Sequence, residues 1–143
     1  MTSHTPWFMS AALSVLLERS QHLSLDARVL LEALVLTGGE LGSAEQVADA
    51  LHFRSRFQLA RRLRREGLPP LHEIADWIRV IHWVDEWEER GTALCRQAVR
   101  AGRDPAVCYR LVRRMTGIDW TDVRRRGSSW IAERAVSEVA SRP

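Results

Sequence analysis

The spacing of apolar residues predicts helix along almost the whole chain. Alternating, β-branched runs of the kind that form strands are absent from the sequence. Glycine and proline fall mainly between the periodic segments, where they begin or end helices. The pattern therefore predicts an all-α fold.

Two helices are predicted before residue 40. The first runs from Thr5 to about Ser20, with Pro6 near its first position. The second begins near Ser24 and ends at Gly38, because glycine readily takes the left-handed conformation that stops a helix. Its inward face is predicted to contain Leu30, Leu31, Leu34 and Val35.

The next segment predicts a short helix followed closely by a basic helix. Ser43 and Gln46 have the spacing of a capping box, which marks a helix start. This helix ends by about His52, and the basic helix begins near Ser55 and stops before the prolines of "GLPP". Two short helices joined so tightly form a helix-turn-helix.

A long helix is predicted from Leu71 to Arg90, with Gly91 ending it. Its apolar residues form two adjacent stripes, so we expect it to contact more than one neighbour. The tryptophans of this helix are expected in the core, and so is Trp120. The first stripe contains Ile74, Trp77, Ile78, Ile81 and Val84, and the second contains Val80, Trp83 and Trp87.

The plan of a short helix, a break and a basic helix recurs after the long helix. Asp104 and Pro105 suit the start of the second basic helix, as N-cap and first helical residue. The chain therefore contains an internal repeat with the long helix between the copies. At a separation of 49 residues, Arg54, Leu59, Arg61, Leu63, Arg64 and Arg65 match Arg103, Cys108, Arg110, Val112, Arg113 and Arg114.

These elements divide the chain into five parts. No apolar run approaches the roughly 18 residues that a membrane span needs. The start of the chain lacks the basic segment and cleavage site of a signal peptide, so we expect a cytoplasmic protein. The parts are an N-terminal helix (1–22), a first helix-turn-helix subdomain (23–70), a linker helix (71–91), a second helix-turn-helix subdomain (92–127) and a C-terminal tail or short helix (128–143).

Charge is segregated along the chain, although the net charge is only +3. Residues 51–70 carry a net +5 and residues 92–127 a net +6, whereas residues 1–50 and 71–91 each carry −4. All 21 basic residues are arginine, which a GC-rich genome would also favour, but codon bias does not explain the two blocks. The blocks coincide with the two basic helices. They favour nucleic acid as a partner over simple solvation of the helix faces.

The sequence offers little for catalysis or metal binding. Cys95 and Cys108 fall in apolar helical patterns, so both are expected to be buried free thiols. The five histidines are scattered and have no partners at metal-ligand spacing. Ser128 and Ser129 have no evident histidine base, and no glycine-rich phosphate loop follows a strand. We therefore expect no enzymatic activity, no cofactor and no metal.

Two segments resemble the two helix-turn-helix units of AraC/XylS-type transcription regulators. They are "LHFRSRFQLARRLRRE", residues 51–66, and "AGRDPAVCYRLVRRMTGIDWTDVRRR", residues 101–126. In the second, the similarity lies in the Asp-Pro helix start, the R-x-x-R-R run and the "TG" that follows. The order of two such units around one long helix also fits. The resemblance covers roughly residues 25–127.

The chain departs from that family in several places. His52 and Ala101 stand where glycine is usual in the turns, and Gly102 stands where the family has an aromatic residue. Residues 118–120, "IDW", replace the usual small residue and proline. The family's common N-terminal ligand-binding barrel has no counterpart here. The chain thus resembles a stand-alone DNA-binding module.

The resemblance implies a transcription regulator in which the second helix of each unit enters the major groove of DNA. Arginine suits base reading because it contacts guanine bidentately. Base reading is expected in the first unit from Arg54, Ser55, Arg56, Gln58 and Arg61 or Arg62. It is expected in the second unit from Arg103, Pro105, Ala106, Tyr109 and Arg110, with only apolar contacts from the proline and alanine. Phosphate contacts are expected from Arg64, Arg65, Arg113, Arg114, Arg124, Arg125 and Arg126.

The expected partner is double-stranded DNA, and the resemblance adds RNA polymerase as a candidate partner. A second hypothesis, suggested by the altered turns, is a protein-interaction module that docks through the tryptophan-rich linker and the N-terminal helix. Trp7 lies beside an apolar run and suggests a surface for a partner protein or a second copy. Packing of this segment onto the linker helix explains the same pattern equally well.

Overall fold

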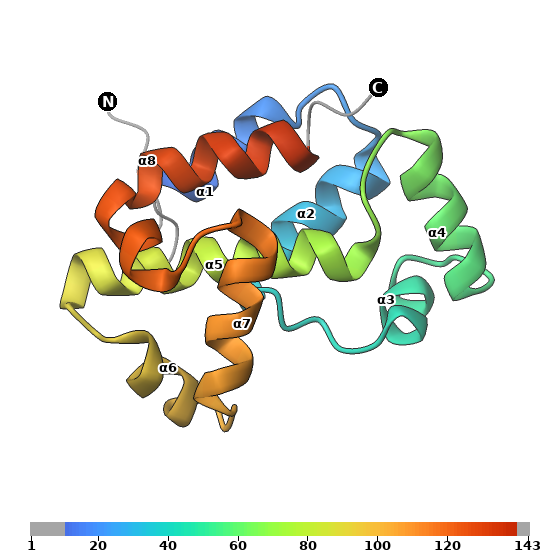
Figure 1. The fold of residues 1–143 in the computed structure, drawn as a ribbon. Coiled ribbons are helices and arrows are strands. Elements are labelled where there is room, and N and C mark those ends of the chain that lie inside the picture. Colours follow the sequence, from blue (N-terminus) through green and yellow to red (C-terminus); the bar gives the residue numbers. More distant parts are fainter. Residues whose placement is uncertain (1–10, 140–143) are drawn as a thin grey trace, which may run out of the picture.

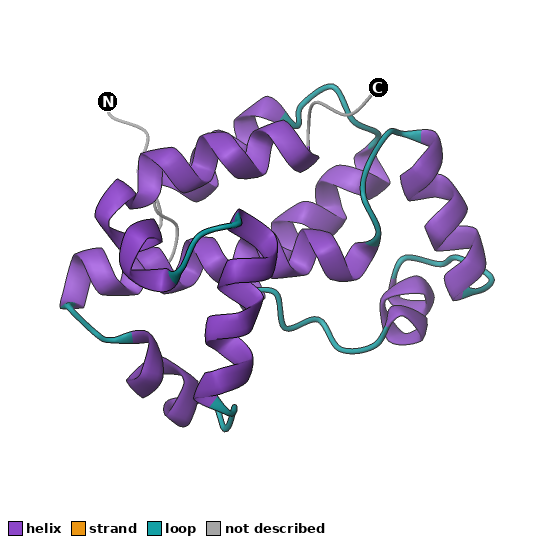
Figure 2. Ribbon diagram, in the orientation of Figure 1, coloured by secondary structure: helices purple, strands orange, loops and turns teal. Residues whose placement is uncertain are grey.

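The computed structural model describes residues 11–139, and every regular element in that range is a helix (Figure 2). The predicted all-α class is confirmed. The beginning of the first predicted helix, with Pro6 and Trp7, lies outside the described residues. The helices are α1 (Ala11–Arg19), α2 (Leu25–Thr37), α3 (Ala44–Ala50), α4 (Arg56–Arg65), α5 (Leu71–Arg90), α6 (Leu94–Arg100), α7 (Pro105–Thr116) and α8 (Trp120–Val139).

Helix α5 is central to the molecule, as Figure 1 shows, and contacts α1, α2, α6, α7 and α8. The prediction of more than one neighbour is thus confirmed. Trp83 and Trp87 are half-buried against the core, whereas Trp77 is fully buried, as is Trp120 on α8. Each large apolar side chain buried in this way stabilises the fold by about 1.5–3 kcal/mol. The buried apolar residues of α5 are Ile74, Ala75, Trp77, Ile78, Val80, Ile81 and Val84.

The helix ends follow the capping residues that the sequence provides. Ser43 and Gln46 form the predicted capping box, in which each side chain accepts a hydrogen bond from the other's backbone N–H. Asp104 caps α7 by accepting a hydrogen bond from the Ala106 N–H at 2.9 Å. Gly91 ends α5 in the left-handed conformation, with φ 68°. These caps satisfy backbone groups that a helix end would otherwise leave unpaired.

Helix α8 belongs to the core of the molecule. A break at Gly127, with φ 88°, interrupts it and starts the segment predicted as a tail or short helix. That segment is helical as far as Val139, and α8 packs against α1 and α5. Its buried side chains after the break are Ile131, Ala132, Ala135, Val136 and Val139.

Helices α3 and α4 contact each other, as do α6 and α7; we name these the first and second helix pairs. The same hydrogen bond closes the turn in each pair. It runs from the Phe53 N–H to the Ala48 carbonyl and from the Arg103 N–H to the Ala98 carbonyl, at 2.8 Å in both. The turns are therefore related by a shift of 50 residues, as are α3 and α6. The second turn is one residue shorter, so α4 and α7 are related by 49.

This register corrects two statements drawn from the sequence. Arg54 and Arg103 are not equivalent, because the 49-residue match holds only from the N-cap of the basic helices onward. The left-handed position of the turn is His52 in the first pair (φ 63°) and Gly102 in the second (φ 70°), not Ala101. The second turn therefore has glycine at its left-handed position, which glycine adopts readily. The first turn has histidine there, and a left-handed conformation is unfavourable for a residue with a side chain.

The two helix pairs are attached differently to the rest of the molecule. Helix α7 contacts α5 and α8 as well as α6, whereas the one extensive helix contact of α4 is with α3. The end of α4 is joined to the start of α2, where the Glu66 carboxylate accepts hydrogen bonds from the Ser24 N–H and Oγ–H, both at 2.7 Å. In the same region, Arg62 Nη1 lies 3.5 Å from Asp26 Oδ2. The first pair is thus held chiefly near the end of its second helix.

The two cysteines are both free but differ in burial. Cys108 on α7 is buried, as predicted. Cys95 is exposed, so that prediction is wrong. Helix α6 turns Leu94 and Ala98 toward the core, and Cys95, one residue after Leu94, lies on another face.

Candidate nucleic-acid interface

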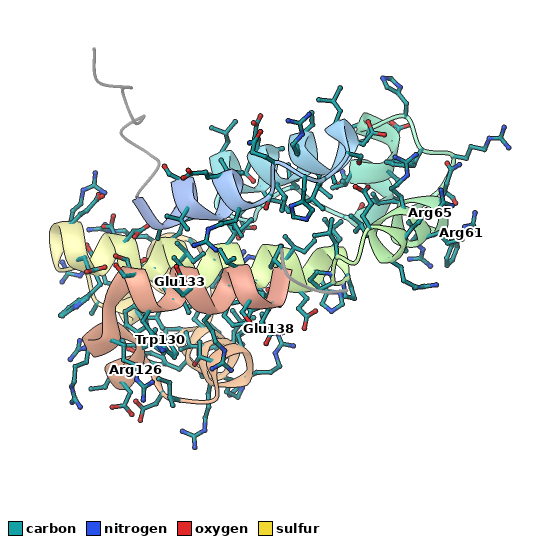
Figure 3. All side chains as sticks on the ribbon, turned by 90° about the horizontal axis from the view of Figure 1, so that it is seen from above. Arg61, Arg65, Arg126, Trp130, Glu133 and Glu138 are labelled. Atoms are coloured by element: carbon teal, nitrogen blue, oxygen red, sulfur yellow. The ribbon has the colours of Figure 1, made fainter. Side chains whose placement is uncertain are left out.

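Helix α4 has one buried face and one exposed face rich in arginine. Leu59 and Leu63 are buried, whereas Arg61 and Arg65 point outward at the edge of the molecule (Figure 3). Neither arginine makes an ion pair with any acidic side chain in the described part of the chain, and the same holds for Arg54 and Arg64. A guanidinium stays charged at all relevant pH values, so this face is permanently basic.

Ser55 and Gln58 use their side-chain oxygens to start α4. Ser55 Oγ accepts a hydrogen bond from the Gln58 N–H at 3.2 Å. Gln58 Oε1 accepts one from the Arg54 N–H at 2.7 Å. These contacts leave the amide N–H donors of Gln58 for a base, so both residues contribute first to the helix start.

Arg56 lies between two local contacts. Its Nε is 3.9 Å from a Glu45 carboxylate oxygen, and its guanidinium lies 4.9 Å from the centre of the Phe57 ring. An exposed ion pair of this length contributes about 0–1 kcal/mol, so a phosphate or base could replace the carboxylate. Phe57 itself is 63% exposed. The sequence interpretation missed it, although helical spacing sets it apart from Leu59 and Leu63.

Arg61 and Arg62, the two alternatives for base reading in α4, differ in their surroundings. Arg62 pairs with Asp26 and lies 5.7 Å from the centre of the Phe53 ring. Arg61 has no such contact within the described residues and points to solvent. Arg61 is therefore the more accessible of the two.

Helix α7 repeats the two-faced arrangement of α4. Cys108 and Val112 are buried, whereas Arg110 and Arg113 are exposed. Across the residues that the structure describes, no carboxylate lies within ion-pair distance of either arginine. Tyr109, the residue before Arg110, is also exposed.

The start of α7 offers mainly apolar surface. Pro105 is the first helical residue and is half-buried, and Ala106 is exposed with its N–H bonded to Asp104. Val107 is exposed as well and was not singled out from the sequence. Val99 on α6 adds a further exposed apolar side chain to this helix pair. Such side chains can contact thymine methyl groups but cannot donate to a base edge.

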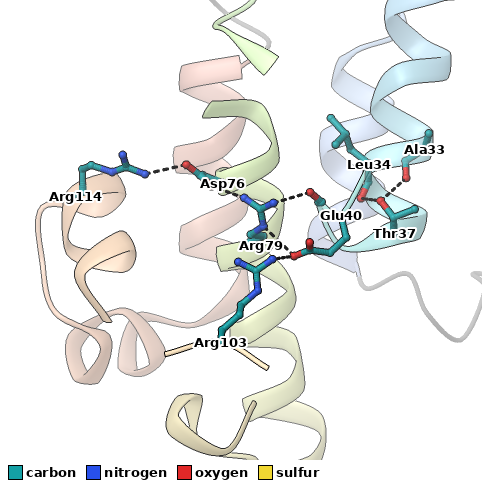
Figure 4. Close-up of polar contacts among 9 residues, drawn as sticks. Ala33, Leu34, Thr37, Glu40, Asp76, Arg79, Arg103 and Arg114 are labelled. Atoms are coloured by element: carbon teal, nitrogen blue, oxygen red, sulfur yellow. Dashed lines mark hydrogen bonds and ion pairs between the residues drawn. The ribbon is translucent and has the colours of Figure 1, made fainter. Parts of the chain in front are cut away.

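Arg103 and Arg114 belong to a chain of ion pairs, the Glu40–Asp76 network, which Figure 4 shows. The Asp76 carboxylate accepts hydrogen bonds from Arg79 Nη1 at 2.6 Å and from Arg114 Nη2 at 2.8 Å. Arg79 Nε donates to Glu40 at 3.1 Å, and Arg103 pairs with the same Glu40 carboxylate. The network joins the loop before α3 to the second helix pair through α5.

The network changes the expectation for two predicted DNA contacts. Arg103 already has a carboxylate partner, and its side chain is only 32% exposed. Arg114 also has one, but its side chain is 61% exposed and keeps free donor groups. Both can still contribute positive potential near α7. Neither offers a fully available guanidinium.

The arginines at the start of α8 lie beside aromatic or acidic side chains. A guanidinium stacked on a ring keeps N–H groups at its edge, so the stacking is compatible with a phosphate contact. Arg124 Cζ lies 4.3 Å from the centre of the Trp87 ring, and Arg126 Cζ lies 4.9 Å from the centre of the Trp130 ring (Figure 3). Arg125 Nη1 lies 3.5 Å from Asp122 Oδ1.

The two basic helices have a related orientation in the molecule. In Figure 1, α4 and α7 both begin on the lower side and run upward. In that view the turn before α4 lies at the right edge and the turn before α7 at the bottom.

None of the helices in the described range has the length and apolar character needed to cross a membrane. No cluster of three or more potential metal ligands occurs in that range either. The likeness to AraC/XylS-type regulators rests on the sequence motifs alone, since comparison with protein-family models, curated proteins and solved structures found no match for this chain.

Proposed function

We propose that this chain binds double-stranded DNA in a sequence-specific way, with α4 and α7 in the major groove, and regulates transcription. One observation carries the proposal. Arg61 and Arg110 occupy equivalent positions on the two helices, and both are exposed and unpaired among the described residues. The chain has 18 acidic residues, so unpaired arginines at repeated positions favour an external anion.

The roles of the remaining arginines follow from their place on each helix. Recognition helices meet base edges with their N-terminal part. Arg61 and Arg110 are each the sixth residue of their helix, nearer its start than Arg65 and Arg113, so we assign base reading to them. Each bidentate arginine contact with guanine contributes about 1–3 kcal/mol of discrimination. Arg65 and Arg113 lie further along their helices and suit phosphates, which fix the position of the protein without reading sequence.

The salt dependence of binding tests the electrostatic part of the proposal. Fluorescence anisotropy of a labelled random duplex should give a slope of log affinity against log salt near −5, if about six phosphates are neutralised. Replacing two phosphate contacts, in Arg65→Ala/Arg113→Ala, should reduce the slope by about 2.

A control with the same change in net charge makes this test specific. Arg19 on α1 and Arg90 at the end of α5 lie outside both helix pairs and are paired with Glu133 and Glu86. The Arg19→Ala/Arg90→Ala variant should keep the wild-type slope. If it loses as much affinity as Arg65→Ala/Arg113→Ala, general charge attraction explains the binding and the proposed interface is wrong.

The alternative, a protein-interaction module, needs exposed tryptophan on α5. Trp77 is buried, Trp83 is half-buried and Arg124 covers Trp87. In the described part of α1, Leu13 and Leu16 are buried too. These observations favour DNA binding over docking through the linker helix.

A further inference from the structure

A groove of about 520 Å³ lies between α4 and the beginning of α5. This volume is within the range of roughly 300–1,000 Å³ that is typical of small-molecule sites. Most of the lining is apolar and comes from α4, from the "GLPP" segment and from the loop before α3. The apolar lining includes Leu34, Leu41, Phe57, Leu63, Leu68 and Leu71.

The backbone around the groove explains why it stays open. Pro69 and Pro70 cannot continue α4, so the chain crosses away from the helix before α5 begins. On the other side, the loop at Gly39 lies tightly against α5. A Cβ at Gly39 would come within 2.7 Å of the Ala75 carbonyl oxygen. Helix α4, the segment that leaves it and the Gly39 loop thus form walls of the groove.

The charged groups that line the groove are all basic. They are Arg56, Arg64 and Arg79; His72 also lines the groove, and no aspartate or glutamate of the described residues does. Arg79 is already bound to Asp76 and Glu40 in the network described above. Arg64 has no ion pair within the described residues and is exposed, so it is the guanidinium best able to bind an incoming anion.

We propose that this groove binds an organic monocarboxylate with an extended apolar body. The body would lie against Phe57, Leu63 and Leu68, and the carboxylate would bind Arg64, with Arg56 beside it. Arginine suits this role because its planar fork binds a carboxylate through two parallel hydrogen bonds. Burial of the apolar body would supply most of the binding free energy, and the arginine would select for the acid. Arg56 and Arg64 are also expected to contact DNA, but the inference is argued from the groove alone, and its test contains no DNA.

The test is isothermal titration calorimetry with three compounds that share one body: 4-phenylbutyrate, 4-phenylbutan-1-ol and 4-phenylbutylamine. We expect saturable binding of one 4-phenylbutyrate per chain, at least about tenfold tighter than the alcohol, because only the acid forms charge-assisted hydrogen bonds. The amine should bind more weakly than the alcohol, since it would face basic groups.

Two variants and a control locate the site. Arg64→Ala should weaken 4-phenylbutyrate about tenfold and leave the alcohol unchanged, because only the carboxylate contact is lost. Ala60 is exposed and lines the groove, so Ala60→Trp should fill it and abolish binding of both compounds without disturbing the core. The control is Arg19→Ala. It removes an arginine on α1 that does not line the groove, so this variant should bind both compounds like the wild type. Circular dichroism checks that each variant is folded.

Three results would overturn the proposal. The first is equal affinity for the acid and the alcohol, or no saturable binding of the acid at up to about 10 mM, where only negligible affinity remains. The second is binding that neither Arg64→Ala nor Ala60→Trp changes. The third is a dimer in sedimentation that Ala60→Trp abolishes while 4-phenylbutyrate does not bind, which would assign the groove to a second copy of the chain.

Discussion

At the residue scale, the two cysteines have opposite environments. Cys108 is 1% exposed, and burial raises the pKa of its thiol, whereas Cys95 is exposed on α6. Because the thiolate is the reactive form, iodoacetamide should modify Cys95 alone in the native protein and both cysteines after denaturation. Peptide mass spectrometry identifies the modified sites. Equal modification of both cysteines in the native protein would contradict the burial of Cys108.

His82 is expected to make folding stability depend on pH. Its Nε2 lies 3.0 Å from the Val35 carbonyl oxygen, and burial lowers its pKa, which this hydrogen bond only partly offsets. The folded state therefore binds fewer protons at this site than the unfolded state, whose pKa is about 6.5. The contribution of His82 is complete above that pH and is lost as the pH falls below it.

Replacement of His82 by glutamine tests this effect, because the amide can still donate to the Val35 carbonyl. Urea unfolding at about pH 7.5 and pH 5.5 brackets the unfolded-state pKa. The wild type should lose more stability between these values than His82→Gln does. The other histidines are common to both proteins and cancel in the comparison. An identical loss in both proteins would rule out His82 as the source.

At the element scale, the two turns provide a matched pair of substitutions. Gly102 is left-handed with φ 70°, and a Cβ there would meet no atom within 4 Å, so Gly102→Ala tests backbone conformation alone. It should lower the free energy of unfolding by about 1–2 kcal/mol. His52→Gly, at the equivalent position with φ 63°, should not lower it by more than about 0.5 kcal/mol, since glycine tolerates this conformation. Chemical denaturation measures both values, and a greater loss for His52→Gly would contradict the assignment.

Most helices could be predicted because their signals are local. A capping residue such as Ser43 or Asp104 acts within three residues, and Gly38 ends α2 through its own conformation. The register of the repeat could not be predicted in the same way. Matching by arginine spacing aligned Arg54 with Arg103, but backbone hydrogen bonds define the turn, and a one-residue difference in its length is invisible to a charge pattern.

At the scale of the whole molecule, the Glu40–Asp76 network should stabilise the fold. The Asp76 side chain is only 8% exposed and serves both Arg79 and Arg114. Asp76→Asn removes the charge from both contacts and should lower the free energy of unfolding by about 1–3 kcal/mol. The control is Asp122→Asn, whose exposed pair with Arg125 should contribute less than about 0.5 kcal/mol. Equal effects of the two variants would contradict a structural role for the network.

The Glu40–Asp76 network could not be predicted from the sequence, although the exposed arginines could. The basic blocks and the two-faced helices were readable from spacing, so Arg61, Arg65, Arg110 and Arg113 could be predicted as exposed. Whether an arginine finds an internal carboxylate depends on which distant segments meet. Arg103 meets Glu40, which lies 63 residues earlier, and no local pattern indicates that contact.

Selection from a random duplex pool at about 0.15 M salt tests the central claim most directly. The wild type, Arg61→Ala/Arg110→Ala and the Arg19→Ala/Arg90→Ala control would be selected in parallel. We expect the wild type and the control to enrich one motif with two half-sites roughly one helical turn apart, and the Arg61→Ala/Arg110→Ala variant to lose it. No enrichment by the wild type, or the same motif from the Arg61→Ala/Arg110→Ala variant, would contradict recognition of DNA by α4 and α7.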